Sequence, residues 1–129
     1  MERSGPDQFQ QESIHTLKWS PAEKKIARRI FDETLQRELD QVVQKVKNMA
    51  LGIKAPDDLW KIEAYLTRTR KAIDDKYDYR YSQLPLVFAR LVQEGRISCE
   101  DLDGLAENKL GYVRFMQESS ARTQRLPTP

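Results

Sequence analysis

Glycine and proline are scarce in this sequence, and so are cysteine and histidine. The 129 residues include 5 glycines, 6 prolines, one cysteine and one histidine. An all-β chain needs turn residues about every 8–12 positions, so the few glycines and prolines disfavour a β-sandwich or a β-barrel. Collagen-like and low-complexity chains are disfavoured for the same reason.

Long apolar runs are also missing. The longest, residues 84–89, contains a proline and is far shorter than the roughly 20 residues of a membrane span. The first twelve residues include three acidic side chains and lack the apolar segment of a signal peptide. The single cysteine, Cys99, cannot form an internal disulfide, which indicates a reducing compartment. The sequence therefore predicts a cytoplasmic protein without membrane insertion.

Strong charge of one sign is absent as well. The chain carries 22 Lys+Arg against 20 Asp+Glu, and this near balance does not steer it toward nucleic acid or anionic lipid. The only histidine, His15, lies in the N-terminal segment, and Cys99 is followed by two acidic residues. The sequence therefore offers no Ser-His, Cys-His or His-metal arrangement on a folded core and no glycine-rich phosphate loop. We expect neither catalysis nor a metal nor a cofactor.

Helical periodicity is what the sequence does contain. Ser20, Pro21 and Glu23 form a helix start in which Glu23 completes a capping box. Apolar residues then recur at three- and four-residue spacing until Gly52 and Pro56 end the pattern. A helix of roughly 30 residues is about 45 Å long at 1.5 Å per residue. Helices of this length usually pack in a bundle or pair with a second chain.

Three shorter helices are predicted after the long one. The second begins after Pro56 and the third covers roughly residues 82–94. The fourth is predicted to be capped by Ser98 and Asp101 and to continue to Met116. The predicted fold class is therefore all-α, with about four helices of which the first is unusually long.

The two ends of the chain lack this periodicity. Residues 1–18 are mostly polar, and residues 119–129 carry arginines and prolines. We expect a disordered N-terminal tail at 1–18 and a frayed C-terminal tail at 119–129. The helical domain is expected between them, at residues 19–118.

The long helix carries an apolar stripe that three short helices cannot cover. Its members recur at three- and four-residue spacing: Leu35, Leu39, Val43, Val46 and Ala50. We expect a second copy of the chain to cover this stripe. The pattern therefore predicts a homodimer.

The densest basic stretch in the predicted second helix is residues 68–71, and three tyrosines follow shortly after it. Basic and aromatic residues together can bind single-stranded nucleic acid. Asp74, Asp75 and Asp78 neutralise this stretch within a few turns. We therefore expect no nucleic-acid binding.

Trp60 stands apart from the apolar seam of the second helix. At about 100° per residue it falls well over 90° from the seam that contains Leu59, Ile62, Leu66 and Ile73. A tryptophan in such a position either packs on another helix or lies in a contact with a partner protein, where Trp and Arg are enriched. Periodicity alone leaves both possibilities open.

Five segments of the sequence carry a recognisable pattern. They are Trp19-Ser20-x-x-Glu23, Arg37-Glu38-Leu39-Asp40, Asp57-Asp58-Leu59-Trp60-Lys61, Ile73-Asp74-x-Lys76-Tyr77-Asp78-x-Arg80 and Val87-Phe88-Ala89-x-Leu91-Val92-Gln93-Glu94-Gly95. With these segments the chain resembles the fluorescence recovery protein family of cyanobacteria, from about Trp19 to Lys109.

The resemblance implies an all-helical homodimer in which long helices of two protomers form a stalk that carries smaller helical heads. It also implies that the chain is not an enzyme and has no cofactor. The implied partner is the light-activated orange carotenoid protein, bound mainly through that partner's C-terminal domain. Binding speeds its return to the orange resting state and helps to release it from the phycobilisome. The implied location is cytoplasmic, with the periphery of the thylakoid or the phycobilisome as an alternative.

The resemblance further implies a contact surface on the second helix. Its centre matches Trp60 and Arg70, which are both present. Next to them, Glu63 and Ala64 stand where the family typically has His and Asp. The predicted partner-binding residues are therefore Trp60, Glu63, Ala64 and Arg70.

Two positions in the head also depart from the family pattern. Leu86 replaces an aromatic residue that is common in the family, and Tyr112 replaces a basic residue of the fourth helix. Two functions stay open at this point. One is the family activity, and the other is a helical dimeric scaffold that binds a different partner outside photoprotection.

Overall fold

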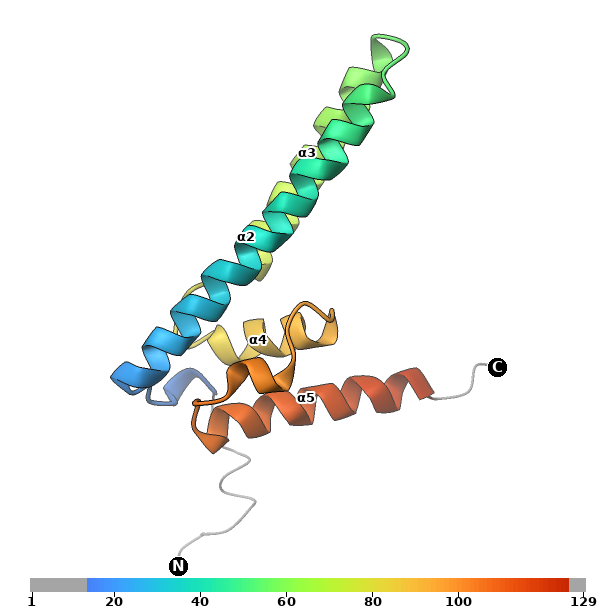
Figure 1. The fold of residues 1–129 in the computed structure, drawn as a ribbon. Helices are drawn as coiled ribbons and strands as arrows, with labels where there is room; N and C mark the ends of the chain where they lie inside the picture. The colour runs from blue at the N-terminus through green and yellow to red at the C-terminus, as the bar shows by residue number, and fades with distance from the viewer. Residues whose placement is uncertain (1–13, 126–129) are drawn as a thin grey trace, which may run out of the picture. The chain divides into compact units, whose positions relative to one another are not determined.

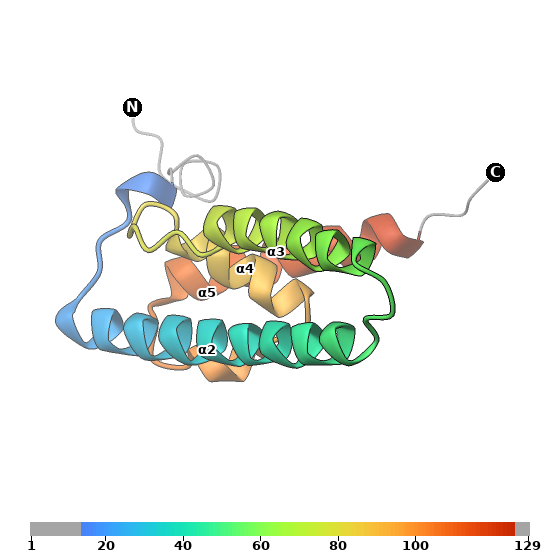
Figure 2. The ribbon, with the colours of Figure 1, turned by 90° about the horizontal axis from the view of Figure 1, so that it is seen from above.

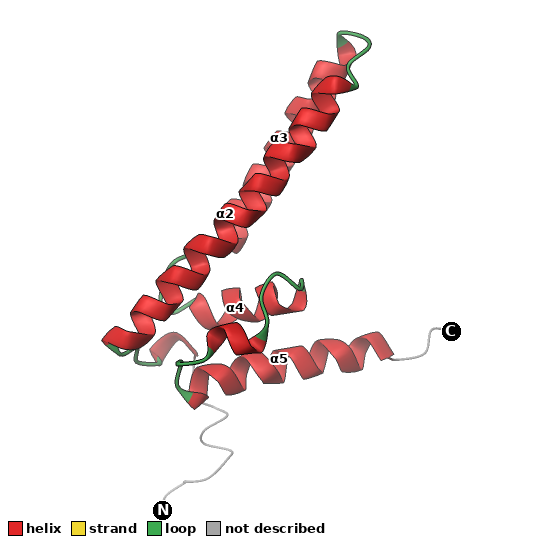
Figure 3. Ribbon diagram, viewed as in Figure 1, coloured by secondary structure: helices red, strands yellow, loops and turns green. Residues whose placement is uncertain are grey.

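The computed structural model describes residues 14–125, and within them it contains helices and no β-strand (Figures 1 and 3). The α-helices of this part of the chain are α2 (Pro21–Leu51), α3 (Asp57–Lys76), α4 (Leu84–Gln93) and α5 (Glu107–Arg125). Two short 3-10 helices accompany them, η1 (Ile14–Thr16) and η2 (Cys99–Leu102). The predicted all-α fold with a long first α-helix is confirmed.

Contacts divide the chain into two compact units. Residues 31–78 form the hairpin unit, which contains most of α2 and all of α3. The head unit consists of the described residues 14–30 and 79–125, so it combines the first turns of α2 with α4, η2 and α5. The hairpin unit is thus one continuous stretch of chain inserted between the two parts of the head unit.

α2 begins with the capping box that the sequence predicts. The backbone N–H of Ser20 donates to Glu23 Oε1 at 2.9 Å, and the N–H of Glu23 donates to Ser20 Oγ at 3.1 Å. These bonds satisfy amides that would otherwise lack partners at a helix start. α2 then runs for 31 residues to Leu51, where Gly52 begins the turn.

In the hairpin unit, α2 and α3 run antiparallel and side by side (Figures 1 and 2). Asp58 organises the turn between them, because its Oδ2 accepts the backbone N–H groups of Lys54 and Ala55 at 2.8 and 3.1 Å. These two bonds, together with Lys61 Nζ at 3.3 Å from Oδ1, hold the pKa of Asp58 below its usual value. The carboxylate therefore stays charged in the first turn of α3, where negative charge is favourable.

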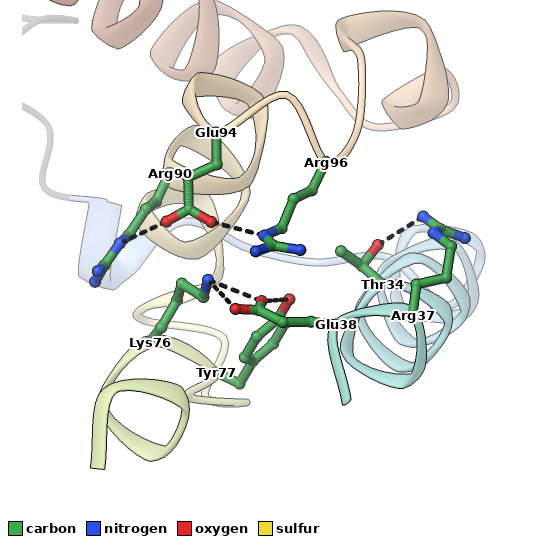
Figure 4. Close-up of polar contacts among 8 residues, drawn as sticks. All are labelled: Thr34, Arg37, Glu38, Lys76, Tyr77, Arg90, Glu94 and Arg96. Atoms are coloured by element: carbon green, nitrogen blue, oxygen red, sulfur yellow. Dashed lines mark hydrogen bonds and ion pairs between the residues drawn. The ribbon is translucent and has the colours of Figure 1, made fainter. Parts of the chain in front are cut away.

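The end of the hairpin away from this turn is held by side chains from both helices. Lys76 Nζ lies 2.8 Å from Glu38 Oε1 and donates to Oε2 at 2.9 Å, while the Tyr77 hydroxyl donates to Oε1 at 2.7 Å (Figure 4). Phe31 packs edge-on against the Tyr77 ring, with centroids 5.4 Å apart. Charged and aromatic contacts therefore set the register of α2 against α3.

The core of the head unit is centred on α4. Seven of its ten residues are buried, as its wide apolar face predicts: Leu84, Pro85, Val87, Phe88, Ala89, Leu91 and Val92. α5 packs against α4 and contributes the buried Val113. Gly95, at φ 75°, ends α4, and the N–H of Arg96 donates to the Leu91 carbonyl at 2.9 Å.

The prediction of a single fourth helix from Ser98 onward is wrong. Ser98 and Asp101 do form a capping box, but it begins η2, a four-residue 3-10 helix. Gly104 then adopts φ 106°, and α5 starts only at Glu107. Glycine takes a positive φ without steric cost, and a Cβ at position 104 would collide with the side chain of Ile26. The positive φ of Gly104 therefore interrupts the helix that was expected to continue from Ser98.

Parts of both expected tails, residues 1–13 and 126–129, lie outside the described residues. Within the described part of the N-terminal tail, η1 forms and His15 Nδ1 lies 3.0 Å from the Ser82 carbonyl oxygen. At the other end, α5 extends past residue 119 as far as Arg125. Among residues 14–125, no helix is both long enough and apolar enough to cross a membrane.

Candidate partner-binding surface

α3 exposes a tryptophan on the side that faces away from α2. Trp60 is 63% exposed. Tyr65 and Lys76 are residues of α3 that contact α2, and Trp60 lies about 140° and 160° from them around the helix at 100° per residue. Within the single chain the ring therefore lies at the surface. Large aromatic rings in such positions are enriched in contacts with partner proteins.

The other three predicted surface residues, Glu63, Ala64 and Arg70, are also exposed on α3. Arg70 Nε lies 3.8 Å from Oδ2 of Asp74, one turn further along, and the two side chains are 86% and 69% exposed. An ion pair this exposed contributes little to stability. The guanidinium can therefore exchange Asp74 for a carboxylate or carbonyl of a partner.

The structure does not bring Trp60 and Arg70 into contact with each other. Ten positions separate them along α3, which corresponds to a rise of about 15 Å and a rotation of about 80°. Glu63 and Ala64 lie within about 6 Å of rise from Trp60, by the same geometry. The four residues thus form an elongated surface, and a partner must span about three turns of α3 to contact all of it.

The stripe predicted for dimerisation is largely exposed in the single chain. Leu39 is 39% and Val43 is 50% exposed. Ala50 is exposed as well, whereas Leu35 and Val46 are half-buried. An apolar stripe of this length on α2 is therefore left without a full covering in the hairpin unit.

α3 extends this apolar stripe with Leu59 and Leu66, which are 50% and 41% exposed. On α3, each leucine is rotated around the helix by about 100–120° from Tyr65, the residue that contacts α2. On α2, Leu39 is rotated in the same sense by about 100° from Glu38, the residue that contacts α3. In antiparallel helices, rotations in the same sense point to the same side of the pair. The leucines of α3 and the stripe of α2 therefore share one face, which we call the apolar face of the hairpin unit.

Leu59 and Leu66 are the residues that sequence reasoning missed at this surface. Periodicity groups them with Ile62 and Ile73 in one seam, but a seam does not reveal how much of it a single neighbouring helix covers. Ile73 is buried at 8% exposure, whereas the two leucines are largely exposed to solvent. The exposure of these leucines could have been inferred from the width of the apolar seams of α2 and α3, since each seam is wider than the contact with one neighbouring helix requires.

Leu86 and Tyr112, the two head positions that the resemblance marks as departures, have different surroundings. Leu86 on α4 is 43% exposed. Tyr112 on α5 is half-buried, and burial raises the pKa of its phenol above the usual value. Both belong to the head unit, whereas Trp60 and Arg70 belong to the hairpin unit.

Possible metal ligands do not gather in the described part of the chain. Between residues 14 and 125, no group of three or more His, Cys, Asp or Glu side chains could hold a metal ion. Cys99 is half-buried with a free thiol. Glu38 and Glu94, which are among the acidic groups with several contacts, bind lysine, tyrosine and arginine side chains instead (Figure 4).

Comparison with known proteins identifies the family of this helical chain. The sequence profile of the photoprotection regulator fluorescence recovery protein matches residues 19–117. The chain belongs to the fluorescence recovery protein family. A fluorescence recovery protein from Synechocystis is 41% identical over 98 residues, which cover 76% of this chain and 90% of that protein.

Solved structures of fluorescence recovery proteins share the fold. The structure of the Fremyella diplosiphon protein is 34% identical and superimposes with a TM-score of 0.74. The structure of the Synechocystis protein is 39% identical and also has a TM-score of 0.74. Each comparison covers 78% of this chain and 99% of the other. The likeness to fluorescence recovery proteins thus extends over nearly their whole length.

Proposed function

We propose that this member of the fluorescence recovery protein family binds the photoactivated orange carotenoid protein and speeds its return to the orange resting state, which ends quenching at the phycobilisome. The observation that carries the proposal is Trp60, which is 63% exposed on the side of α3 that faces away from α2. The family match over residues 19–117 supports it. In this proposal the functional domain is residues 19–118.

A regulator of this kind acts by differential binding and not by making or breaking bonds. It speeds a conformational return only if it stabilises the path back more than the active form that it first meets. Trp60 supplies apolar contact area, and Arg70 supplies a planar set of donors for a carboxylate or for backbone carbonyls. Glu63 and Ala64 complete the contact surface beside Trp60.

The proposed working form is a homodimer that covers the apolar face of the hairpin unit. Its residues are Leu35, Leu39, Val43, Val46 and Ala50 of α2, with Leu59 and Leu66 of α3. The exposure of Val43 at 50% and of Leu39 at 39% supports this assignment. Removing apolar surface from water is favourable by roughly 25 cal/mol per Å², and a two-fold axis brings the same face of two copies together.

A second function is favoured by the positions at which this chain departs from the family pattern. Glu63 stands in place of a histidine, and Ala64 in place of an aspartate. Tyr112 is half-buried, and because a phenol is never positively charged it does not supply the charge of a basic residue. The second candidate is therefore a helical dimeric scaffold that binds a different protein, outside photoprotection.

The deciding experiment mixes the protein with photoactivated orange carotenoid protein and follows the red-to-orange recovery by absorbance. The wild type is expected to accelerate the recovery. Arg70→Leu is expected to weaken binding by about 1–3 kcal/mol through lost polar contacts, and Trp60→Ala by about 2 kcal/mol or more. Arg68→Leu is the matched control, since it removes the same charge about 160° away around α3.

Two results would redirect the assignment. Full acceleration that Arg70→Leu leaves unchanged would mean that the partner contacts another surface. No acceleration by the wild type, combined with acceleration by a Glu63→His, Ala64→Asp double variant, would show that the chain lost the family activity at these two positions. That result would favour the second function.

A further inference from the structure

Arg70 lies at the edge of the apolar face of the hairpin unit. Around α3 it is rotated by about 20° from Leu59 and by about 40° from Leu66, whereas Trp60 is rotated by about 100° from Leu59. The Arg70 side chain is 86% exposed in the single chain, and both leucines are exposed as well. A second copy that covers the apolar face therefore comes to lie directly beside Arg70.

Two contacts between α2 and α3 fix the heights of residues along the hairpin unit. Lys76 Nζ lies 2.8 Å from Glu38 Oε1, so these two residues share one height. Lys45 Nζ lies 5.8 Å from the centroid of the Tyr65 ring, so this pair shares another. At 1.5 Å of rise per residue, the two pairs give the height of every residue of α3 relative to α2.

The exposed part of the apolar face has a definite centre. Measured from Leu39 toward the turn, Arg70 lies at about 5 Å, Trp60 at about 20 Å and Leu59 at about 21 Å. The exposed side chains of the face extend from Leu39 to Leu59, so their centre lies at about 10 Å, level with Leu66. Arg70 and Trp60 thus lie on opposite sides of this centre, at comparable distances from it.

Two-fold symmetry can bring the apolar faces of two copies together in two ways. An axis parallel to the helices places α2 on α3 of the second copy at equal heights, so that Val43, at about 6 Å, meets the charged Arg70. Burying a charge against an apolar side chain is costly. An axis perpendicular to the helices places like helices on each other in opposite directions, with Leu66 against Leu66 at the centre. The apolar face therefore favours the perpendicular axis.

We propose that the partner-binding surface is shared between two copies of the chain, with Trp60 contributed by one copy and Arg70 by the other. A perpendicular axis at about 10 Å moves Arg70 of the second copy to about 16 Å, within one turn of the height of Trp60. Within a single chain the same two residues differ in height by about 15 Å. The inference rests on the proposed homodimer and the proposed function, and it gives two equal surfaces per dimer.

Charge complementarity supports the same register. Glu63 lies at about 15 Å, the height to which the axis moves Arg70 of the second copy, and the two residues differ by only about 20° around their helices. Opposite charges that meet at the rim of an interface fix its register, although an exposed pair adds little stability. A guanidinium has five N–H donors, so one that contacts Glu63 keeps donors for a partner protein.

The shared surface places two kinds of contact side by side. The Trp60 ring, which is 63% exposed, offers apolar area, and the Arg70 guanidinium offers a planar set of donors. The ion pair of Arg70 with Asp74, at 3.8 Å and largely exposed, is weak enough to be exchanged. The expected occupant is a folded protein surface that carries an apolar side chain and a carboxylate about one turn of helix apart.

Subunit complementation tests the shared surface. Chains with two different affinity tags are coexpressed, and the heterodimer is isolated through both tags. In the heterodimer of Trp60→Ala with Arg70→Leu, one shared surface carries both substitutions and the other carries none. Its acceleration of the red-to-orange recovery is expected to reach about half that of the wild type. The homodimer of either variant should stay well below this level, because both of its surfaces lack one contact.

The matched control is the heterodimer of the wild type with the double variant Trp60→Ala, Arg70→Leu. It contains the same number of substitutions, but each shared surface now lacks one contact. We expect it to accelerate the recovery no more than the homodimers of the single variants. Half of the wild-type acceleration in this control, combined with a loss in the first heterodimer, would show that one chain supplies both residues and would overturn the proposal.

Crosslinking tests the same geometry without the carotenoid protein. Chains with Trp60→Cys and chains with Arg70→Cys, both in a Cys99→Ser background, are mixed and treated with a short bismaleimide. Crosslinked dimers are expected in the mixture and not with either variant alone, because the two copies of position 60 differ in height by about 18 Å and those of position 70 by about 12 Å. Arg68→Cys in place of Arg70→Cys is the control, since it lies about 160° away around α3.

The two measurements separate this inference from the function on which it rests. A wild type that leaves the recovery unchanged, together with crosslinking in the mixture alone, would contradict the proposed function and support the shared arrangement of Trp60 and Arg70. Crosslinking of either variant with itself as fast as in the mixture would overturn that arrangement. A wild type that is a single chain by light scattering would overturn it as well.

Discussion

Lys76 and Glu38, 38 residues apart in the sequence, form an ion pair of 2.8 Å at the end of the hairpin away from its turn. Their side chains are only 6% and 12% exposed. The Tyr77 hydroxyl donates to the same carboxylate at 2.7 Å. All three residues lie in segments that carry the family resemblance, so this contact gives a structural reason for part of that pattern.

Removing one partner of this buried pair should be costly. Lys76→Met leaves the Glu38 carboxylate poorly compensated, and we expect it to lower the free energy of unfolding by about 3–5 kcal/mol. Tyr77→Phe, which removes only a hydroxyl, should cost about 1 kcal/mol. Urea unfolding followed by circular dichroism measures both. Equal effects of the two variants would contradict the role given to the ion pair.

The carboxylate of Glu23 links the start of α2 to the residues that precede α5. Burial opposes its charge, but the N–H groups of Ser20 and Ala106, together with Lys109, outweigh burial and hold the pKa of Glu23 below the usual 4.5. A pKa that is lowered in the folded state means that the charge stabilises the fold above pH 4.5. This contribution is lost as pH falls through the lowered pKa.

Glu23→Gln is therefore expected to lower the free energy of unfolding at neutral pH by about 2–4 kcal/mol. It should also flatten the decrease in stability on acidification, because the titrating group is gone. Chemical unfolding can be followed by tryptophan fluorescence, to which Trp19 contributes, because its ring centroid lies 4.8 Å from Lys109 Nζ in the folded state. The exposed control Glu63→Gln should match the wild type. A Glu23→Gln variant as sensitive to acid as the wild type would count against this account.

Alanine substitutions at two glycines are expected to change the free energy of unfolding in opposite directions. Gly104→Ala forces a side chain into a positive φ beside Ile26, and we expect a loss of about 1–3 kcal/mol. Gly111 lies inside α5, where a Cβ meets only Glu107 Oε2 at 3.6 Å. Gly111→Ala should therefore stabilise the protein by up to about 1 kcal/mol. Thermal unfolding of the two variants checks the signs, and a neutral Gly104→Ala would contradict the role of this break.

Val43→Glu tests the proposed homodimer. It introduces a charge into the apolar face of the hairpin unit, where burial without a partner costs several kcal/mol. Light scattering should give about twice the chain mass of 15.1 kDa for the wild type and the single-chain mass for the variant. Gln44→Glu adds the same charge about 100° away on α2 and should stay dimeric. A monomeric wild type at micromolar concentration would end the proposal.

We expect no shift of a single-stranded oligonucleotide in a low-salt gel assay. The densest basic stretch of α3 is neutralised by nearby acidic residues, and Arg70 already pairs with Asp74 at 3.8 Å. Binding that depends on phosphates would weaken steeply with salt. A shift that Arg68→Ala with Arg70→Ala abolishes would reverse this expectation.

Features that depend on neighbours in the sequence were predictable. The capping box of Ser20 and Glu23 and the stop at Gly52 set the bounds of α2 within a residue or so. The break at Gly104 was missed because the Ser98 cap and the apolar spacing after it favour one helix by local rules. The side chain that a Cβ at this position would meet, Ile26, is remote in the sequence.

Contacts between distant residues were beyond sequence reasoning. The pairing of Glu38 with Lys76 depends on the register of two helices, which the periodicity of each helix alone does not fix. The residues of the candidate partner-binding surface were taken from the family resemblance. The exposure of Trp60, and of Leu59 and Leu66, required knowing that α2 covers only one side of α3. The positions of helices follow from local sequence patterns, whereas the exposure of a side chain depends on which elements pack against it.

The insertion of the hairpin unit into the head unit sets an order of events during synthesis. The hairpin unit is complete once residue 78 has been made. Glu23, by contrast, meets Ala106 only after 83 further residues, a wait of roughly 4–17 s at bacterial-like elongation rates of about 5–20 residues per second. Local helical pairs form within milliseconds. A nascent chain that pauses when its first 78 residues have left the ribosome would therefore contain a folded hairpin unit and only the first residues of the head unit, which still lacks most of its core.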